Sequence, residues 1–314
     1  MNPTFTTPVT IAPLQEPLGY HQQWFALGSC FSEHMGRRLH HAGFRVGINP
    51  FGVLFNPLSI SRSITRLLHA RPVMEEELFF YGSVWNHFQF SNLHSGIDKE
   101  QTLNHMNERI ANASGLLQTA GVLLLTFGTS WIYEHKETKE LVANCHKLPG
   151  AQFIRRRLTV DEIVNEYAQV LPGLPKEMKV IFTVSPVRHW KDGAHENTLS
   201  KSVLHLAIDE LQRVFPSTGY FPAYELVIDE LRDYRFFNDD MVHPSDLAVD
   251  YVWQQFINYG FTTDTRTIIR EVEHFRRMEQ HRSLHPDSDE NQAFIRKTEL
   301  QKEVLLKRYP YLKL

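Results

Sequence analysis

The 314-residue chain contains only two cysteines, has a net charge of −3 and lacks any long uninterrupted apolar run. Two cysteines, Cys30 and Cys145, cannot form a disulfide framework, which favours a reducing compartment. Residues 1–17 carry four prolines but neither the basic nor the apolar region of a signal peptide. No stretch approaches the roughly 20 apolar residues that span a bilayer. We therefore expect a cytoplasmic protein that does not enter membranes.

Nucleic-acid, nucleotide and metal binding are disfavoured by further absences. The small net charge offers no large positive field to nucleic acid. Neither a Walker motif nor a Gly-rich dinucleotide fingerprint occurs. Cys145 and His146 are adjacent, so they cannot easily chelate one ion, and no paired spacing beside them completes a tetrahedral site. We expect no metal, no cofactor and no nucleic-acid partner.

Short apolar runs alternate with amphipathic stretches along the chain, which is typical of an α/β domain. Apolar runs without alternation predict buried strands over residues 24–27, 121–127, 179–186 and 224–228. Amphipathic periodicity predicts helices over residues 31–42, 57–68, 101–120, 160–171, 199–214 and 245–259. The alternation indicates a parallel sheet with helices on both faces, which binds ligands at the carboxyl ends of its strands.

Capping signals place several helix ends. Asn56 before Pro57 predicts a helix start, and Thr159-Val160-Asp161-Glu162 has the form of a capping box. Gly43 follows the last apolar residue of the first helix and predicts its end. We expect these three signals to set helix boundaries.

The composition changes after Gly260, where two further amphipathic and charged helical stretches follow. We expect a domain over residues 1–262 and a helical extension over residues 263–314. These helices would pack on the domain or on a partner subunit, so a homo-oligomer built through them is one expectation.

Gly28-Ser29-Cys30 lies between the first expected strand and the first expected helix. A nucleophile at a helix N-terminus benefits from backbone N–H groups that stabilise an oxyanion and from a dipole that lowers a thiol pKa. Cys30 is the better placed nucleophile, although Ser29 stays an alternative. A buried, inert Cys30 behind a Ser29 N-cap is the competing interpretation.

Asp240 and His243 are three residues apart, so one turn of chain can bring both side chains to the same side. A histidine that acts as a base needs an orienting carboxylate. Because the chain has 17 histidines, such a pair can also arise by chance in a solvated loop. Our hypothesis makes His243 the base and Asp240 its orienting partner.

Further residues near the expected strand ends complete a hypothetical site. Gly52 and Ser130 are candidate oxyanion donors, although a turn glycine and a helix cap explain them equally well. Four side chains are expected to contact substrate: Trp131, Asn144, His146 and His189. Residues 144–147 can also be interpreted as a surface loop. His189 can also be interpreted as a histidine at the rim that has no functional role.

Phe25-Ala-Leu-Gly-Ser-Cys-Phe-Ser32 resembles the signature of the GSCFA domain family, with Ser32 where the family name has Ala. Other segments that resemble the family are residues 126–131, 144–149, 183–188 and 240–244. The resemblance covers about residues 20–260. That family is similar to the SGNH/GDSL hydrolases, which implies a flavodoxin-like three-layer α/β/α fold and ester or acyl chemistry.

The resemblance also implies residue roles. Cys30 falls at the nucleophile of the Gly-Asp-Ser block, and Gly52 falls at the glycine of the second block. Ser130 stands where the Gly-x-Asn block has Asn, and Asp240 and His243 match the Asp-x-x-His block. A thiol thus replaces the hydroxyl, and the oxyanion Asn is absent.

Three functions follow from these observations. The first is an acyl ester hydrolase that acts on a small-molecule or carbohydrate ester. The second is a carbohydrate O-acyltransferase with the same residues, because a thioester suits transfer as well as hydrolysis. The third is a non-catalytic carbohydrate-binding module, which the altered nucleophile and the missing Asn favour.

Overall fold

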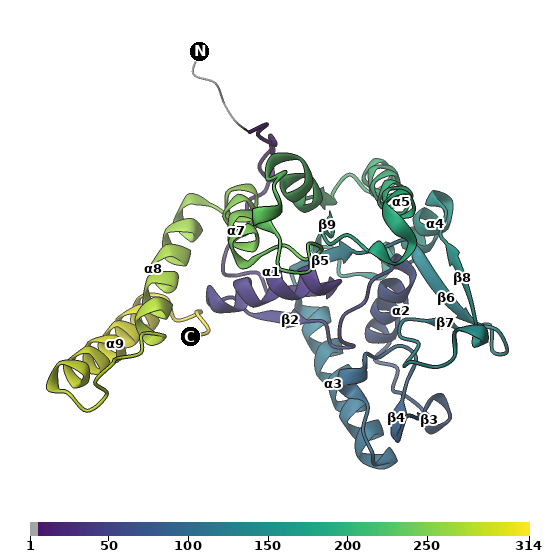
Figure 1. Ribbon diagram of the computed structural model, residues 1–314. Coiled ribbons are helices and arrows are strands. Elements are labelled where there is room, and N and C mark those ends of the chain that lie inside the picture. The colour runs from purple at the N-terminus through teal and green to yellow at the C-terminus, as the bar shows by residue number, and fades with distance from the viewer. Residues whose placement is uncertain (1–5) are drawn as a thin grey trace.

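The computed structural model describes residues 6–314, so residues 1–5 of the expected domain and of the N-terminal segment lie outside the described residues. Its centre is a five-stranded sheet of order β10-β9-β5-β1-β2 (Figure 1). The strands are β1 (Trp24–Gly28), β2 (Val46–Ile48), β5 (Val122–Phe127), β9 (Lys179–Val184) and β10 (Gly219–Tyr220). All neighbouring pairs are parallel. Counted along the chain within this sheet, the order is the flavodoxin-like 2-1-3-4-5, which confirms the predicted fold class.

Helices cover both faces of this sheet. They are α1 (Cys30–His41), α2 (Pro57–Leu68), α3 (Lys99–Thr119), α4 (Val160–Val170), α5 (Gly193–Val214), α6 (Ala223–Glu225) and α7 (Asp246–Gly260). Two further helices, α8 (Thr263–Glu279) and α9 (Asp289–Arg308), follow toward the C-terminus. Helices α2, α3, α4 and α5 share one apolar core with the sheet, and α1, α6 and α7 share the other. Figure 1 shows these two groups on opposite sides of the strands.

The strands are apolar on both sides because each face has its own core. In β1, Phe25 and Leu27 join the core under α2 to α5, whereas Trp24 and Ala26 join the core under α1 and α7. Successive side chains of a strand point to opposite faces, so a strand covered twice reads as a continuous apolar run. This arrangement is the reason that the unbroken runs predicted β1, β5 and β9 correctly.

The capping predictions are confirmed. The Asn56 side chain accepts a hydrogen bond of 2.8 Å from the Ser59 backbone N–H and begins α2. Thr159 and Glu162 form the reciprocal capping box of α4. Gly43 ends α1 with a φ of +86°, a conformation that glycine adopts without steric cost.

The strand predicted over residues 224–228 is wrong. Residues Ala223–Glu225 form α6, and Leu226–Glu230 continue as a π-helical turn, η6. The Leu226 N–H bonds to the Pro222 carbonyl, so Pro222 stands at the start of the helical segment, where its fixed φ favours a helix. A short apolar run is compatible with both states, and here it buries one helical side. The fifth strand is instead the two-residue β10.

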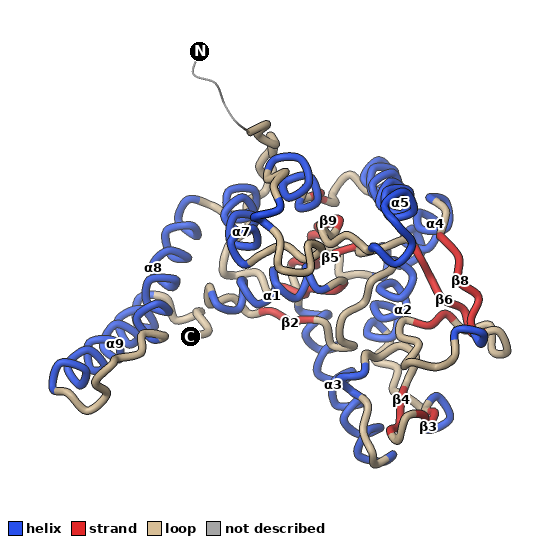
Figure 2. Tube along the Cα trace, in the orientation of Figure 1, coloured by secondary structure: helices blue, strands red, loops and turns tan. Residues whose placement is uncertain are grey.

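Two smaller sheets were not predicted. Strands β6 (Trp131–His135), β7 (Leu141–Val142) and β8 (Phe153–Arg157) form an antiparallel sheet, and β3 (Phe79–Tyr81) pairs with β4 (Val84–Asn86). Figure 2 shows these strands apart from the central sheet. Only three residues separate the end of β5 from the start of β6, so this sheet lies beside the carboxyl edge of the central one.

The C-terminal helices form a hairpin that projects from the sheet (Figure 1). Its base is fixed: Ile269 of α8 joins the core under α1 and α7, and the Lys313 N–H bonds to the Gly43 carbonyl at 3.0 Å. The boundary predicted at residues 262/263 falls between α7 and α8 and stays a prediction. Within residues 6–314, no helix has both the length and the apolar character needed to cross a membrane.

Candidate functional site

The carboxyl ends of β1, β5 and β9 lie level with one another. Gly28 of β1 is in register with Thr126 of β5, and Thr126 is in register with Thr183 of β9. The segments that follow these strands therefore leave the sheet at one edge. They are the segments that the sequence singled out, beginning at Ser29, Gly128 and Ser185.

A rigid turn connects β1 to α1. Gly28 has a φ of +137°, and a Cβ atom there would lie 2.2 Å from the Thr126 carbonyl oxygen. The Gly28 N–H donates to the Asn49 side-chain oxygen at 2.9 Å, and the Ser29 N–H donates to the Thr126 carbonyl at 3.2 Å. Only glycine fits this close approach, so the turn directs the next two residues without freedom to shift.

Ser29 and Cys30 differ in accessibility. Ser29 is 1% exposed, and its buried hydroxyl has no hydrogen-bond partner within the described residues. Cys30 is the first residue of α1 and is partly exposed. Of the two, the thiol is therefore the group that a ligand can reach.

Burial raises the pKa of the Cys30 thiol above its ordinary value of 9.0. The Phe31 backbone N–H and the charge of Lys201 act in the opposite direction, because both stabilise a thiolate. The raised pKa means that the sulfur carries its proton at neutral pH. A reaction that begins with a thiolate therefore needs a base.

Lys201 is a functional candidate that we did not predict. It is 2% exposed, and its ammonium group donates 2.6 Å hydrogen bonds to the carbonyls of Gly128 and Ser185. These carbonyls directly follow β5 and β9, so one side chain of α5 joins two strand ends. Desolvation lowers the pKa of Lys201 to about 7, although the Cys30 thiolate favours its charged form.

The sequence does contain a signal for Lys201. It lies on the buried stripe of α5 with Leu204, Ile208 and Leu211, at the three- and four-residue spacing of a helix face. A lysine on such a stripe is rarely buried without a role. The prediction for this helix considered only its apolar residues, and for that reason it did not include Lys201.

Asn49 is a second residue of the site that we did not predict. Its side-chain oxygen is bonded to Gly28, and its amide nitrogen is buried without a partner within residues 6–314. Its φ of 37° belongs to the left-handed region, which asparagine tolerates better than most residues. Asn49 is 5% exposed, so its side chain positions the Gly28 turn and does not reach a ligand.

Neither predicted oxyanion donor is free. The Gly52 N–H donates to the Asn49 carbonyl at 2.8 Å within its turn. Ser130 is fully buried, and both its N–H and its hydroxyl bond to the Ser200 hydroxyl, at 2.8 and 3.0 Å. Both roles are corrected for the same reason: these polar hydrogens already close hydrogen bonds that shape the loops.

Asp240 and His243 meet as the spacing predicted. The His243 Nδ1 lies 2.6 Å from an Asp240 carboxylate oxygen, and the other carboxylate oxygen accepts the N–H groups of Val242 and His243. These backbone bonds, followed by the His243 ring, lower the pKa of Asp240 to about 2. The ring is 46% exposed. Asp240 thus remains ionised at neutral pH and leaves Nε2 of His243 unoccupied.

His189 lies between the buried lysine and the exposed histidine. Its pKa falls to about 4, mainly through desolvation and also through the charges of Lys201 and His243. Its Nε2 is buried without a partner within the described residues, and its ring stands edge-on to Phe55 at 5.7 Å. With its pKa lowered in this way, the His189 imidazole is neutral at neutral pH.

The sequence matches the GSCFA family over residues 23–256. The chain belongs to the GSCFA family. The match extends from β1 to α7 and so includes all the segments at the carboxyl edge. Helices α8 and α9 lie beyond it. A comparison with curated proteins gives no match.

In this GSCFA protein, Cys30 and His243 are not joined directly. Within residues 6–314, no hydrogen bond connects the Cys30 sulfur to His243 or to another side chain. Electrostatic coupling runs instead from Cys30 to Lys201, from Lys201 to His189, and from His189 to His243. The structure thus supports one neighbourhood, in which the thiol and the imidazole are separated.

Two predicted substrate contacts stabilise a loop. The Asn144 side chain accepts the His146 N–H at 2.9 Å, and the His146 Nε2 lies 2.9 Å from the His87 carbonyl. His146 is 5% exposed, so its ring is not available to a ligand. Trp131 is partly exposed, and the Arg155 guanidinium lies 4.2 Å over its ring. Of these three predicted contacts, Trp131 and Asn144 are partly exposed and His146 is buried.

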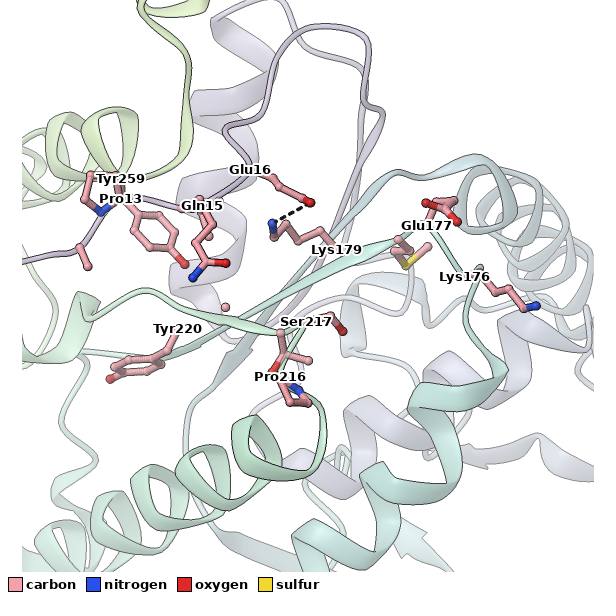
Figure 3. Close-up of a pocket in the computed structure, with 15 residues that line it drawn as sticks. Pro13, Gln15, Glu16, Lys176, Glu177, Lys179, Pro216, Ser217, Tyr220 and Tyr259 are labelled. Carbon is pink, nitrogen blue, oxygen red and sulfur yellow. Dashed lines mark hydrogen bonds and ion pairs between the residues drawn. The ribbon is translucent and has the colours of Figure 1, made fainter.

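A cavity of about 500 Å³ lies at the opposite edge of the sheet (Figure 3). Its lining includes Lys179 and Gly219, the first residues of β9 and β10, and Figure 3 shows Glu16 pointing toward Lys179 across it. These are amino ends of strands, so this cavity does not serve Cys30. Among residues 6–314, no cluster of three His, Cys, Asp or Glu side chains could hold a metal ion.

Proposed function

We propose that this GSCFA protein is an acyl ester hydrolase of the SGNH type, with Cys30 as its nucleophile. One observation carries the proposal: Cys30 is the reachable group at a strand-to-helix turn that glycine geometry holds rigid. Ligands bind at the carboxyl ends of such sheets, and a helix N-terminus favours developing negative charge. The substrate class would be a small-molecule or carbohydrate ester.

The proposed reaction begins with the loss of the thiol proton. His243 Nε2 accepts this proton while Asp240 stabilises the imidazolium through Nδ1. The thiolate adds to the ester carbonyl, the alcohol leaves with the proton from His243, and a thioester remains on Cys30. Water, deprotonated by His243, then cleaves the thioester and releases the acid. The proton of Cys30 leaves with the alcohol in the first half of the reaction. In the second half, the Cys30 thiolate leaves the acyl carbon and takes from His243 the proton that came from water, so the enzyme is regenerated.

The proposal requires the loop of residues 237–245 to bring His243 to the thiol when an ester binds. Catalytic hydrogen bonds are often long without substrate and tighten in the complex. The loop is closed by an internal hydrogen bond of 2.8 Å from the Asn238 N–H to the His243 carbonyl. Its tight turn places Met241 in the left-handed region, with a φ of 56°. These contacts let the loop move as one unit.

Two residues outside the original prediction complete the proposed site. The Cys30 N–H, at the first turn of α1, replaces Gly52 and Ser130 as the oxyanion donor. The buried Asn49 side chain is a positioning residue, because it holds the Gly28 N–H of the same turn. Lys201 is a positioning residue, because it fixes the strand ends that carry Ser185 and Gly128. Its charge also stabilises the thiolate once this has formed.

The test is the hydrolysis of short p-nitrophenyl esters by wild type and by the variants Cys30→Ala, Ser29→Ala and His243→Ala. Cys145→Ala serves as the matched thiol control. We expect Cys30→Ala and His243→Ala to lose activity by at least about 100-fold, whereas Cys145→Ala retains it. Mass spectrometry should find the acyl group on Cys30. Equal rates in all five proteins would refute the proposal.

A non-catalytic carbohydrate-binding module is the second candidate. The observation that favours it is the raised pKa of Cys30 together with the separation of thiol and imidazole. It predicts sugar binding that survives Cys30→Ala and no acyl adduct on the sulfur. Acyl transfer is distinguished in the same assay, because an added sugar acceptor would then capture the acyl group faster than water does.

A further inference from the structure

A cavity of about 210 Å³ lies beside the loop that carries Asp240 and His243. Its lining residues are Arg188, Trp190, Val227, Ile228, Arg232, Asp233, Tyr234, Phe237 and Met241. Met241 belongs to the Asp240–His243 loop itself. The volume is below the roughly 300–1,000 Å³ of pockets for drug-sized ligands, so the cavity suits one ring or a short chain.

The charged groups of this cavity are unbalanced. Within residues 6–314, neither Arg188 nor Arg232 makes an ion pair, and the buried Nε of Arg188 has no hydrogen-bond partner. The carboxylate of Asp233 is already neutralised by Arg235, through bonds of 2.9 and 3.0 Å. The cavity therefore offers guanidinium groups to a ligand and no free carboxylate.

The remaining lining gives the cavity flat and apolar surfaces. The Arg188 guanidinium lies 4.8 Å over the Trp190 ring, which fixes the direction of its donors. Trp190 and Tyr234 are 47% and 73% exposed, whereas Val227 at the base is fully buried. Exposed aromatic faces around an apolar base are suited to a sugar ring. Free arginine donors are suited to a carboxylate or a phosphate on that ring.

The cavity also lies next to the carboxyl edge of β9. Two of its lining residues, Arg188 and Trp190, follow the last residue of β9 by four and six positions. A ligand held by Arg188 would thus place its neighbouring atoms near the carboxyl edge of β9, where Ser185 and His189 lie.

We infer that the cavity binds a sugar ring that carries a carboxylate or phosphate group, with Arg188 as its ion-pair partner. This inference rests on the proposed function, because it names the alcohol part of the ester that Cys30 would cleave. The substrate class is an acylated acidic sugar. Binding itself does not depend on the thiol, so it can be measured separately.

The first experiment measures binding to the full-length Cys30→Ala protein by titration calorimetry. The probes are methyl glucuronide, glucose 6-phosphate and, as the neutral match, methyl glucoside. We expect either anionic sugar to bind roughly ten- to one-hundred-fold more tightly than the neutral one, as a charged hydrogen bond contributes. The two anions distinguish a carboxylate from a phosphate.

Two variants assign this preference to the cavity. Arg188→Gln should abolish the preference for the anionic sugars and leave the weak binding of methyl glucoside unchanged. Arg235→Gln should also weaken it, because Asp233 then becomes an unpaired negative charge in the lining. Arg213→Gln is the matched control, since Arg213 pairs with Asp209 on the exposed side of α5. It should bind as the parent protein does.

The outcomes separate the two proposals. Equal binding of charged and neutral sugars, or a preference that survives both Arg188→Gln and Arg235→Gln, overturns the cavity inference. A preserved preference with no Cys30-dependent hydrolysis of acetylated glucuronide leaves the cavity inference standing and counts against the hydrolase. Cleavage of acetylated glucoside and glucuronide at equal rates supports the hydrolase and counts against the cavity.

Discussion

The buried ammonium group of Lys201 donates a 2.6 Å hydrogen bond to the carbonyl of Gly128, directly after β5. Gly128 also packs against the Gly28-Ser29-Cys30 turn, because a Cβ atom on Gly128 would lie 3.2 Å from the Cβ of Ser29. The same ammonium group bonds to Ser185 after β9. One side chain thereby joins the ends of β5 and β9 beside the turn that follows β1.

Lys201→Met should change how stability depends on pH. The pKa of Lys201 is about 7 in the folded protein and returns toward its ordinary value of 10.5 on unfolding. Between pH 7 and 9 the unfolded chain then binds more protons, so the free energy of unfolding rises with pH, by about 2 kcal/mol. In Lys201→Met this rise should be absent. Urea denaturation at several pH values measures it, with Lys191→Met as control; parallel curves for all three proteins would contradict the assignment.

Cys30 should react slowly with iodoacetamide at neutral pH and faster as the pH rises past 9, because its pKa is raised. Lys201→Met removes a charge that favours the thiolate, so Cys30 labelling should slow further near pH 7, where Lys201 is still partly protonated. At pH 9 and above Lys201 is neutral, and both proteins should then react at the same rate. Cys145, on which Lys191 acts instead, is the internal control within the same protein. Peptide mass spectrometry follows both sites. A slowing shared by Cys145 would point to a general change in structure.

Asp240→Asn should reduce kcat/KM for ester hydrolysis by roughly 100- to 10,000-fold, because an amide cannot stabilise the His243 imidazolium. The pKa of Asp240 is about 2, so its carboxylate stays ionised from acidic to alkaline pH, and its protonation causes no loss of activity above about pH 4. Initial rates across this range test both points. Asp239→Asn, one residue away and also exposed, is expected to keep wild-type rates.

Gly28→Ala should destabilise the protein by at least about 2 kcal/mol, since its φ is +137° and the new methyl group would meet a backbone oxygen. Gly115→Ala is the matched control. Gly115 lies in the exposed part of α3 with open space around it, so alanine there should stabilise the helix by roughly 0.5–1 kcal/mol. Thermal unfolding of both variants compares them; similar shifts would show that the turn is not rigid.

The parts of the fold that were predicted correctly depend on sequence patterns among residues close together in the chain. Unbroken apolar runs marked β1, β5 and β9, and capping residues such as Asn56 and Thr159 marked helix starts. The strand predicted over residues 224–228 was wrong, because the short apolar run Leu226-Val227-Ile228 has no period that separates a strand from a helix. The small antiparallel sheets were missed because their strands are short and partly polar.

Features of the candidate site were predicted correctly only where the interacting residues lie in one short segment of the chain. The Asp240–His243 bond and the placement of Cys30 after a strand are of this kind. Gly52 and Ser130 were wrong as oxyanion donors, because their polar hydrogens are taken by Asn49 and Ser200. Which partner occupies a donor depends on residues far away in the chain.

The sequence by itself determined β1, β5 and β9, the helices packed on them, and the thiol at the start of α1, since local sterics and apolar periodicity act over a few residues. Only the tertiary structure decided that Lys201 of α5 joins β5 to β9, that Ser29 is buried while Cys30 is reachable, and that Arg188 faces a cavity beside His243. Burial, hydrogen-bond partners and desolvation are properties of the packed chain, and they set the chemistry of each side chain.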